Sequence, residues 1–339
     1  MFDSWNGALL VAKPEGITSF GVIERLQRTL MDQRGIKRKF LPKVGHGGTL
    51  DPFATGLLVV CVGQGVKLAR YFLGSSKVYE GVIRFGERTA SGDPTTEIVE
   101  RTDVVPMSRE PLQAAATLMT REPYYQTPPM HSAKKRDGKP LYELARQGIE
   151  VEREAKELTL FEFDIQNLEN ARSAFCVRCS SGTYVRTLAQ DLAVKVGSVG
   201  MLDSLNRLAS GEFNLGQALP LQAILDLTTA GNAWNQLSAW VPFDRMLGRV
   251  PRVEASKDEA LALMRGQQGC LTGLIARAAL AADEELLAIY GGAELVAVAR
   301  RENGAWGLER VFAPTPPAKN ANARMADAAG TARLTVTAV

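Results

Sequence analysis

The chain has 339 residues, enough for about two domains at ~150 residues per domain. Hydrophobic residues make up 45% of it and charged residues 23%, a balance typical of a globular protein with a sizeable core. This composition excludes disorder of the whole chain and a collagen-like structure. The formal net charge of +3 is compatible with a nucleic-acid partner but does not by itself argue for one, so the distribution of charges has to decide.

Cysteine content and hydropathy predict a cytoplasmic protein without a metal site. Four cysteines are too few for a disulfide scaffold, which favours a reducing compartment. The N-terminal segment has an acidic residue before any basic one and only a short apolar run, so it is not a secretory signal. No apolar stretch approaches the ~20 residues of a membrane span, and we expect no membrane partner. Cys176 and Cys179 form a lone CxxC in a strand-like pattern that turns the sulfurs to opposite faces, which disfavours zinc.

The first part of the chain predicts a strand, a helix and a second strand. The apolar run 7–13 predicts a buried strand. Ser19 is expected to cap a helix whose apolar residues recur at helical spacing. A basic connector, RGIKRKFLPK, and a glycine-rich turn, VGHGGTLDPFATG, then lead to the run 57–62, which predicts a strand buried on both faces.

Strands and helices continue without a regular alternation. We expect strands at 78–86, 158–165 and 173–180, and helices at 108–119 and 186–196. Because a doubly wound sheet needs alternating strands and helices, this order favours an α+β fold.

The pattern changes after about residue 249. Residues 285–312 contain strand-like runs punctuated by Gly291-Gly292 and Asn303-Gly304, which predict hairpins. Residues 313–339 carry many alanines and no aromatic residue, which predicts a disordered tail. We therefore expect a main domain over 1–248, a small β-rich domain over 249–312, and the tail.

The window from Gln33 to Tyr79 carries the most information about function. It contains eight Lys and Arg residues and a single carboxylate, Asp51, in a turn rich in glycine that lets the backbone approach a ligand closely. An Asp before Pro is also common in ordinary turns, where it bonds its own backbone. The basic surroundings favour function, because cations attract phosphate while the one acid is available for chemistry.

A second basic stretch includes Lys134, Lys135 and Arg136, near Tyr142. Such runs are usually solvated surface. Here the run belongs to a polar insertion between apolar segments, and such loops can become ordered on RNA. We expect an RNA-binding loop over about 124–152.

Several blocks along residues 8–215 match one family in order. GHGGTLDPFATGLL resembles the catalytic motif of the TruB family of tRNA pseudouridine synthases, which isomerise the T-loop uridine (position 55) of tRNA. PPMHSAKKRDGKPLYELARQG is similar to the RNA-gripping thumb loop of that family. Four shorter blocks resemble its other motifs: Lys13-Pro14 with Gly16, Lys77-Val78-Tyr79, Ser181 to Arg186, and Leu205 to Leu208. Residues 249–312 resemble its small PUA-type RNA-binding domain only loosely.

The resemblance implies a pseudouridine synthase fold, with a mixed, mainly antiparallel central sheet flanked by helices and loops and a small PUA-like C-terminal domain. It implies a catalytic set in which Asp51 pairs with Arg186 and Tyr79 stacks on the target base. The substrate-binding residues that it implies are His46, Tyr79, Tyr184, Leu205, Lys13, Lys134 and Lys135. The chain departs from the family at Gly47, where many members carry Thr, and at Ala90, where Asp is frequent.

Pseudouridine formation needs one ionised carboxylate beside the sugar and a dry slot for the detached uracil. It involves no redox change and no energy input, so no cofactor is expected. A pocket of Tyr and Leu raises the pKa of Asp51 by desolvation, whereas a guanidinium within ~4–6 Å lowers it by about 1–3 units. We therefore expect Asp51 to be ionised at neutral pH, held in direction by the planar fork of Arg186. The sequence does not distinguish attack of Asp51 on C1′ from assisted glycosidic cleavage.

Other functions fit parts of the pattern. A non-catalytic RNA-binding or tRNA-folding protein on the same scaffold would keep the basic stretches but would not need Asp51. A hydrolytic N-glycosidase would release free uracil, although many glycoside hydrolases employ two carboxylates. A guide-RNA-dependent relative would rely on partner proteins, whereas the extended thumb stretch favours direct recognition of the T-arm of tRNA. We expect a monomer with no obligate protein partner.

Overall fold

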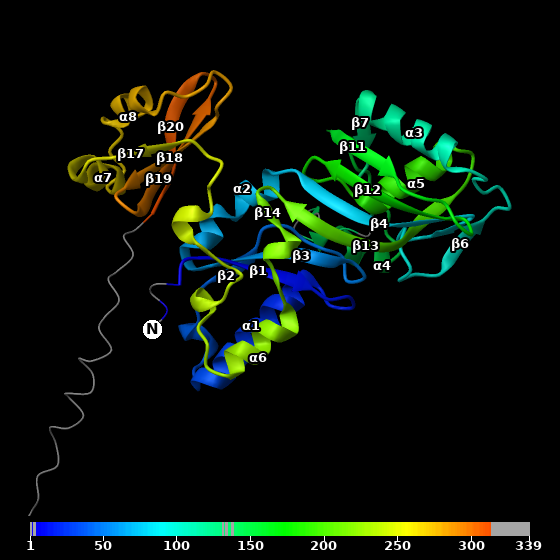
Figure 1. Cartoon of the computed structure of the whole chain (residues 1–339), viewed down its shortest axis with the longest axis horizontal. Coiled ribbons are helices and arrows are strands. Elements are labelled where there is room, and N and C mark those ends of the chain that lie inside the picture. The colour runs from blue at the N-terminus through cyan, green and yellow to red at the C-terminus, as the bar shows by residue number, and fades with distance from the viewer. Residues whose placement is uncertain (1, 3–4, 131, 133–134, 137–138, 313–339) are drawn as a thin grey trace, which may run out of the picture. The chain divides into compact units, whose positions relative to one another are not determined.

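The computed structural model describes residues 2, 5–130, 132, 135–136 and 139–312, and in these ranges the chain forms two compact units (Figure 1). The larger unit runs from Gly7 to Pro242. The smaller one comprises residues 243–312 together with the described residues before Gly7. In the described part of the chain, no helix combines the length and the apolar character needed to cross a membrane. The predicted disordered tail, 313–339, lies outside the described residues.

A mixed, mainly antiparallel sheet organises the larger unit, as expected for the α+β class. Its strands lie in the order β11-β12-β4-β13-β3-β1-β15. The pairs β13–β3 and β1–β15 are parallel and the other neighbours in this order are antiparallel. These strands are β1 (Gly7–Lys13), β3 (Thr55–Val62), β4 (Lys77–Phe85), β11 (Leu160–Ile165), β12 (Arg172–Cys179), β13 (Gly200–Ser210) and β15 (Leu219–Pro220).

Short strands complete this sheet and form three small ones. Within the main sheet, β2 (Val44–His46) pairs with β3, β14 (Phe213–Asn214) with β13, and β16 (Trp240–Pro242) with β1. The two-stranded sheets join β5 (Glu87–Thr89) to β6 (Ile98–Arg101), β7 (Tyr124–Gln126) to β10 (Lys156–Leu158), and β8 (Lys135–Arg136) to β9 (Lys139–Pro140). The strand expected over 158–165 is thus divided. Its first residue belongs to β10, which pairs with β7 outside the main sheet, and Leu160–Ile165 pairs with β12.

Helices pack on the sheet through their apolar faces. Helix α5 (Val185–Lys195) lies on β13 and α3 (Arg109–Arg121) on β11. Leu188 and Leu192 of α5 are buried in one core with Ile83 and Leu202 of the sheet. Helices α1 (Ser19–Arg34) and α6 (Leu221–Thr229) pack against each other (Figure 1). The remaining helical segments are α2 (Ala69–Gly74), α4 (Leu141–Arg146), η1 (Arg38–Phe40), η2 (Gly63–Leu68), η3 (Leu215–Gln217) and η4 (Trp234–Gln236).

The residue that caps α1 is Thr18, whereas the sequence pattern suggested Ser19. Thr18 has the extended conformation that a capping residue adopts, and its hydroxyl accepts a hydrogen bond from the Gly21 N–H at 2.9 Å. Ser19 is the first helical residue, is 1% exposed, and turns its hydroxyl inward to Leu50. The two neighbouring hydroxyls are equivalent as local signals, so only the direction of each side chain decides which one caps the helix.

The smaller unit has its own sheet and core. Strands β17 (Arg252–Glu254), β18 (Leu286–Gly291), β19 (Glu294–Glu302) and β20 (Ala305–Val311) lie in chain order, covered by α7 (Lys257–Met264) and α8 (Leu271–Ala278). Both expected hairpins are present, and Asn303 and Gly304 adopt the positive φ values of 52° and 81° that a tight turn requires. The unit begins at η5 (Phe243–Arg245), a few residues before the boundary placed by the sequence, because Phe243 packs on Phe312 with ring centroids 5.0 Å apart.

Candidate active site

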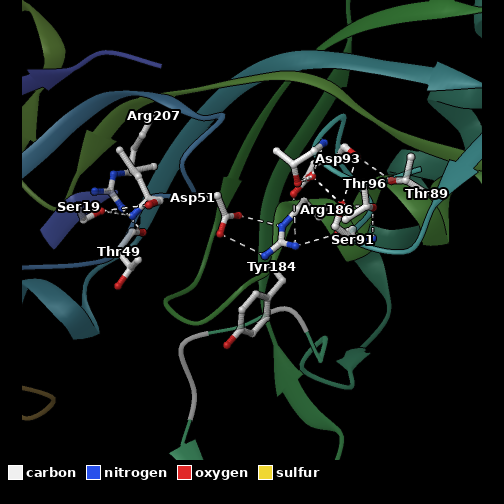
Figure 2. A network of polar contacts seen from close by, with 12 residues as sticks. Ser19, Thr49, Asp51, Thr89, Ser91, Asp93, Thr96, Tyr184, Arg186 and Arg207 are labelled. Carbon is white, nitrogen blue, oxygen red and sulfur yellow. Dashed lines mark hydrogen bonds and ion pairs between the residues drawn. The ribbon is translucent and has the colours of Figure 1, made fainter. Parts of the chain in front are cut away.

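Asp51 lies in the loop that joins β2 to β3, and buried side chains from distant segments hold the backbone of that loop (Figure 2). Arg207 of β13 donates to the carbonyls of Gly48 at 3.1 Å and of Thr49 at 3.3 Å. The Ser19 hydroxyl accepts from the Leu50 N–H at 2.8 Å and donates to the Leu50 carbonyl at 3.0 Å. The peptides that precede Asp51 are therefore fixed before any substrate binds.

The loop passes very close to β13 where it enters β3. Gly56 has a φ of 103°, and a Cβ at this position would lie 2.5 Å from the backbone N and O of Arg207. Only glycine tolerates both the conformation and the approach. The same side chain, Arg207, donates to the Leu57 carbonyl at 2.8 Å, so it holds both ends of the loop.

Asp51 forms the expected ion pair with Arg186, which lies in the first turn of α5. Arg186 Nε is 2.8 Å from Asp51 Oδ2, and Arg186 Nη2 donates to Asp51 Oδ1 at 3.2 Å. The guanidinium is 4% exposed and the carboxylate 34% exposed, so the arginine lies behind the acid and the acid faces the solvent side. One hydrogen bond and one ion-pair contact, each to a different carboxylate oxygen, fix the direction of the carboxylate.

Asp93 is a further member of this network that the sequence analysis missed. Its Oδ2 lies 3.5 Å from Arg186 Nη1, which also donates to the Ser91 carbonyl at 2.7 Å. Asp93 is 5% exposed, and its Oδ1 accepts hydrogen bonds from the Ser91 hydroxyl at 2.6 Å and the Thr95 N–H at 3.0 Å. The segment ERTASGD was visible in the sequence, but nothing local indicates that its last carboxylate is buried against Arg186.

The electrostatic balance at Asp51 is set mainly by burial. Burial raises the pKa of Asp51, and the negative charge of Asp93 raises it further. Arg186 opposes both effects through its charge and its hydrogen bond, and Lys13 adds a smaller lowering of the same pKa. That Asp51 is ionised at neutral pH stays a prediction.

A pocket of about 320 Å³ opens beside Asp51 and gathers the expected aromatic and apolar residues. It is lined by Asp51, Tyr79, Tyr184 and Leu205, with Lys77 and Arg207 on its wall. Tyr79 is 9% exposed, and burial raises the pKa of its hydroxyl while the neighbouring Arg207 lowers it. The phenol therefore stays protonated, and the pocket offers an uncharged aromatic wall next to one carboxylate.

Of the three lysines expected to bind substrate, only Lys13 has a described side chain, and it does not line this pocket. Lys13 is 2% exposed, and its ammonium donates to the carbonyls of Pro14 and Ile17, both at 2.8 Å, and of Pro52 at 3.2 Å. All three protons are thus used on the backbone, which favours a role in holding the loop. Lys134 lies outside the described residues, and of Lys135 only the backbone, in β8, is described.

His46 lies in β2 and is half-buried, but it does not line the pocket. Burial and the charge of Arg207 both lower its pKa, which favours the neutral imidazole. Its Nδ1 is buried without a hydrogen-bond partner among the residues that the structure describes. A contact of His46 with RNA stays a prediction.

The two departures from the family pattern have different surroundings. A Cβ at Gly47 would lie 3.0 Å from the Cβ of Phe72, so a threonine there would require Phe72 to move. Ala90 is exposed and directly precedes Ser91, whose carbonyl accepts a hydrogen bond from Arg186. Within the described ranges, no group of three or more His, Cys, Asp or Glu side chains is arranged to hold a metal ion.

Comparisons with known proteins identify the family of the chain. Residues 34–185 match the model of the family described as TruB family pseudouridylate synthase (N terminal domain). A protein of Burkholderia lata named tRNA pseudouridine synthase B is 38% identical over 307 residues, covering 90% of each chain. One of the same name from Geobacter sulfurreducens is 38% identical over 265 residues, covering 78% of this chain and 83% of that one.

The fold is shared with solved structures of low sequence identity. A chain of a Cbf5-Nop10-Gar1 complex superposes with a TM-score of 0.64 at 21% identity, covering 91% of this chain and 85% of that one. A chain of the archaeal box H/ACA sRNP Nop10-Cbf5 complex gives a TM-score of 0.63 at 19% identity, covering 93% of this chain and 88% of that one. The architecture is therefore that of the pseudouridine synthases. With relatives of 38% identity over most of its length, the chain belongs to the TruB family.

Proposed function

We propose that this protein is a tRNA pseudouridine synthase that isomerises the T-loop uridine at position 55, with Asp51 as the catalytic carboxylate. The relatives named tRNA pseudouridine synthase B support the substrate and the reaction. One observation carries the assignment of the site. The only acid in the basic window faces a small pocket with two tyrosines, and a buried guanidinium pairs with it from behind.

The reaction breaks the N1–C1′ bond of uridine, turns the uracil and forms a C5–C1′ bond. The carboxylate of Asp51 either attacks C1′ or assists departure of the base. The proton on C5 is lost when the new bond forms, and N1 of the product carries a proton in exchange. Since atoms and electrons balance within the substrate, the pocket needs no cofactor.

The pocket suits a nucleotide that has left the T-loop stack. Its volume, about 320 Å³, is at the small end of ligand sites, which span ~300–1,000 Å³. Flipping the uridine out costs a few kcal/mol. Stacking on an aromatic face recovers about 1–3 kcal/mol per base. In this proposal Tyr79 supplies that face, Tyr184 closes the pocket and Leu205 forms its apolar wall.

The basic connector between α1 and β2 is proposed as a phosphate-binding surface beside the site. Its five cations, at positions 34, 37, 38, 39 and 43, are all exposed. Among the described residues none of them is in an ion pair, and residues 33–50 contain no carboxylate. Phe40 is 60% exposed, with Lys39 Nζ 5.0 Å from its ring centroid, and offers a stacking face. The connector reaches the Asp51 loop through the three residues of β2, a distance of about 10 Å.

The smaller unit contributes differently in this proposal. Residues 249–312 hold eight Lys and Arg against nine Asp and Glu, so they lack the excess of positive charge that attracts RNA from a distance. We propose that this PUA-like unit recognises the shape of the bound tRNA, while the connector and the thumb stretch, including Lys134 and Lys135, supply the electrostatic attraction. The protein acts as a monomer in the cytoplasm, without an obligate protein partner.

An unmodified tRNA transcript tests the assignment. With the wild-type protein, chemical probing is expected to map one pseudouridine in the T-loop. Asp51→Asn is expected to abolish it while tRNA affinity stays within about tenfold, because the change removes one charge and almost no volume. Asp103→Asn, at an exposed carboxylate in the loop after β6, is the matched control and is expected to retain wild-type activity.

Two outcomes would favour other functions. If Asp51→Asn forms pseudouridine at near the wild-type rate, the assignment of Asp51 is wrong. If tRNA refolds with the protein but no pseudouridine forms, the protein is an RNA-folding factor on this scaffold, and free uracil in the mixture would indicate a glycosidase.

A further inference from the structure

A buried glutamine, Gln126, contacts the backbone at the start of α5, the helix that carries Arg186. Gln126 is the last residue of β7 and is 2% exposed. Its Oε1 accepts a hydrogen bond from the Tyr184 N–H at 2.7 Å, and its Nε2 donates to the Tyr184 carbonyl at 3.0 Å. One carboxamide thus satisfies both polar groups of the same residue, as a neighbouring strand would.

This contact holds the residue at the start of α5, a helix whose N-cap side chain makes no capping hydrogen bond. Tyr184 is the N-cap residue, and its own side chain makes no capping hydrogen bond. Its carbonyl accepts the first helical hydrogen bond, from the Leu188 N–H at 3.0 Å, as well as the bond from Gln126. The first turn of a helix is its least constrained part, because its N–H groups have no partner within the helix. Arg186 lies in this turn.

Two further residues fix the orientation of the carboxamide. Gln126 Nε2 donates its second proton to the Tyr124 hydroxyl at 2.8 Å, and this hydroxyl donates to Asp191 Oδ2 at 2.6 Å. Each group has a single consistent donor or acceptor role, so the amide cannot rotate by half a turn without losing bonds. Asp191 is also on α5, about two helical turns beyond Tyr184, so β7 holds this helix at two points.

We propose that Gln126 is a positioning residue for the reaction: by fixing the peptide of Tyr184, it sets the direction from which the Arg186 guanidinium reaches Asp51. Ser91 and Asp93 then contact the guanidinium itself, while Gln126 fixes the backbone two residues before Arg186. Tyr184, whose ring lines the pocket, is held by the same contact. The inference rests on the proposed role of Asp51.

The test compares Gln126→Met with Gln113→Met. Gln113 makes the same kind of contact elsewhere, since its Oε1 accepts from the Ile165 N–H at 2.8 Å and its Nε2 donates to the Phe163 carbonyl at 3.2 Å. Each variant replaces a carboxamide that bridges backbone groups by a side chain of similar size, so both are expected to lower the melting temperature. Only Gln126→Met is expected to lower kcat, by about tenfold or more, with KM for tRNA changed less than about threefold.

The pH profile separates positioning from loss of stability. A less well-placed Arg186 counteracts less of the rise that burial causes in the pKa of Asp51. The acid limb of the pH profile, where kcat falls as Asp51 becomes protonated, is therefore expected to move to higher pH in Gln126→Met and to stay in place in Gln113→Met. If Gln126→Met does not fold, Tyr124→Phe replaces it, because it removes only the hydroxyl that orients the amide. A kcat and an acid limb equal to those of Gln113→Met overturn the inference.

The two proposals fail in different ways. An inactive Asp51→Asn together with a Gln126 variant that behaves like the Gln113 control overturns only the role of Gln126. An active Asp51→Asn overturns the assignment of the site itself.

Discussion

Replacing Arg186 by Lys tests whether the direction of the Asp51 carboxylate matters as well as its charge. In the structure Arg186 meets both carboxylate oxygens, at 2.8 and 3.2 Å, and uses its remaining Nη on the Ser91 carbonyl. Lysine keeps the positive charge but concentrates it on one flexible ammonium, which does not reproduce a planar two-point contact. The substitution therefore removes geometry while largely preserving charge.

The expected magnitude follows from the hydrogen bonds that the substitution removes. A hydrogen bond to a charged group contributes about 1.5–3 kcal/mol. Losing the hydrogen bond from Arg186 Nη2 to Asp51 Oδ1 is expected to slow the chemical step by about 10- to 150-fold, at ~1.4 kcal/mol per factor of ten. Because Arg186 lowers the pKa of Asp51 against the effect of burial, weaker pairing raises that pKa. The loss of rate is therefore expected to be larger at acidic pH.

The assay follows release of tritium from C5 of the target uridine under single-turnover conditions, since this hydrogen leaves when the C5–C1′ bond forms. Arg88→Lys is the control: Arg88 pairs with Glu100 at 2.6 Å, but both side chains are more than 40% exposed. An exposed pair contributes little, and this variant is expected to stay within about twofold of wild type. A rate for Arg186→Lys within twofold of wild type, with an unshifted acid limb, would refute the reasoning.

Three more predictions concern the surroundings of the site. Asp93→Asn is expected to lower the melting temperature, because it breaks a buried ion pair. It is also expected to move the acid limb of the kcat profile to lower pH, because the charge of Asp93 raises the pKa of Asp51. A shift of this limb to higher pH would contradict the reasoning. Burial lowers the pKa of Lys13 from 10.5 to about 8, so between these pH values the unfolded chain binds more protons than the folded one. The free energy of unfolding of the wild type, measured in urea, is therefore expected to rise relative to that of Lys13→Met as pH increases from 8 to 10.5. A constant difference between the two proteins would show that folding leaves the pKa of Lys13 unchanged. Reversing the three charges at 37–39 is expected to weaken tRNA binding and to flatten the slope of log K against log salt by about 2–3, with kcat at saturating tRNA nearly unchanged; an unchanged slope would remove the connector from the RNA surface.

Local patterns were enough to predict most of the elements. The strand over 7–13 is found as Gly7–Lys13 and the helix over 186–196 as Val185–Lys195, because strand and helix periodicities are properties of neighbouring residues. The single strand expected over 158–165 differs from the structure, because the bounds of a strand depend on the strand that it pairs with. Residues 156–165 form two strands because the first three pair with β7 and the last six with β12.

The residues of the site were predicted from motifs that occur in the order of the family. The structure shows which of these residues line the same pocket. Asp51, Tyr79, Tyr184 and Leu205 line one cavity, although they come from four separate segments. Lys13 was expected to bind substrate, but its protons are used on backbone carbonyls. The motif identified the residue, and its environment favours another task for it.

The amino-acid sequence by itself determined the family, the class of fold and the lone carboxylate in a basic window, because these depend on residue type and order along the chain. The tertiary structure alone showed that Asp93, Arg207 and Gln126 hold the site. Each of them is an ordinary polar residue in its own segment, and its role arises only when folding removes it from water and leaves it a partner distant in sequence. Burial and hydrogen-bond direction belong to such pairs, and no local pattern encodes them.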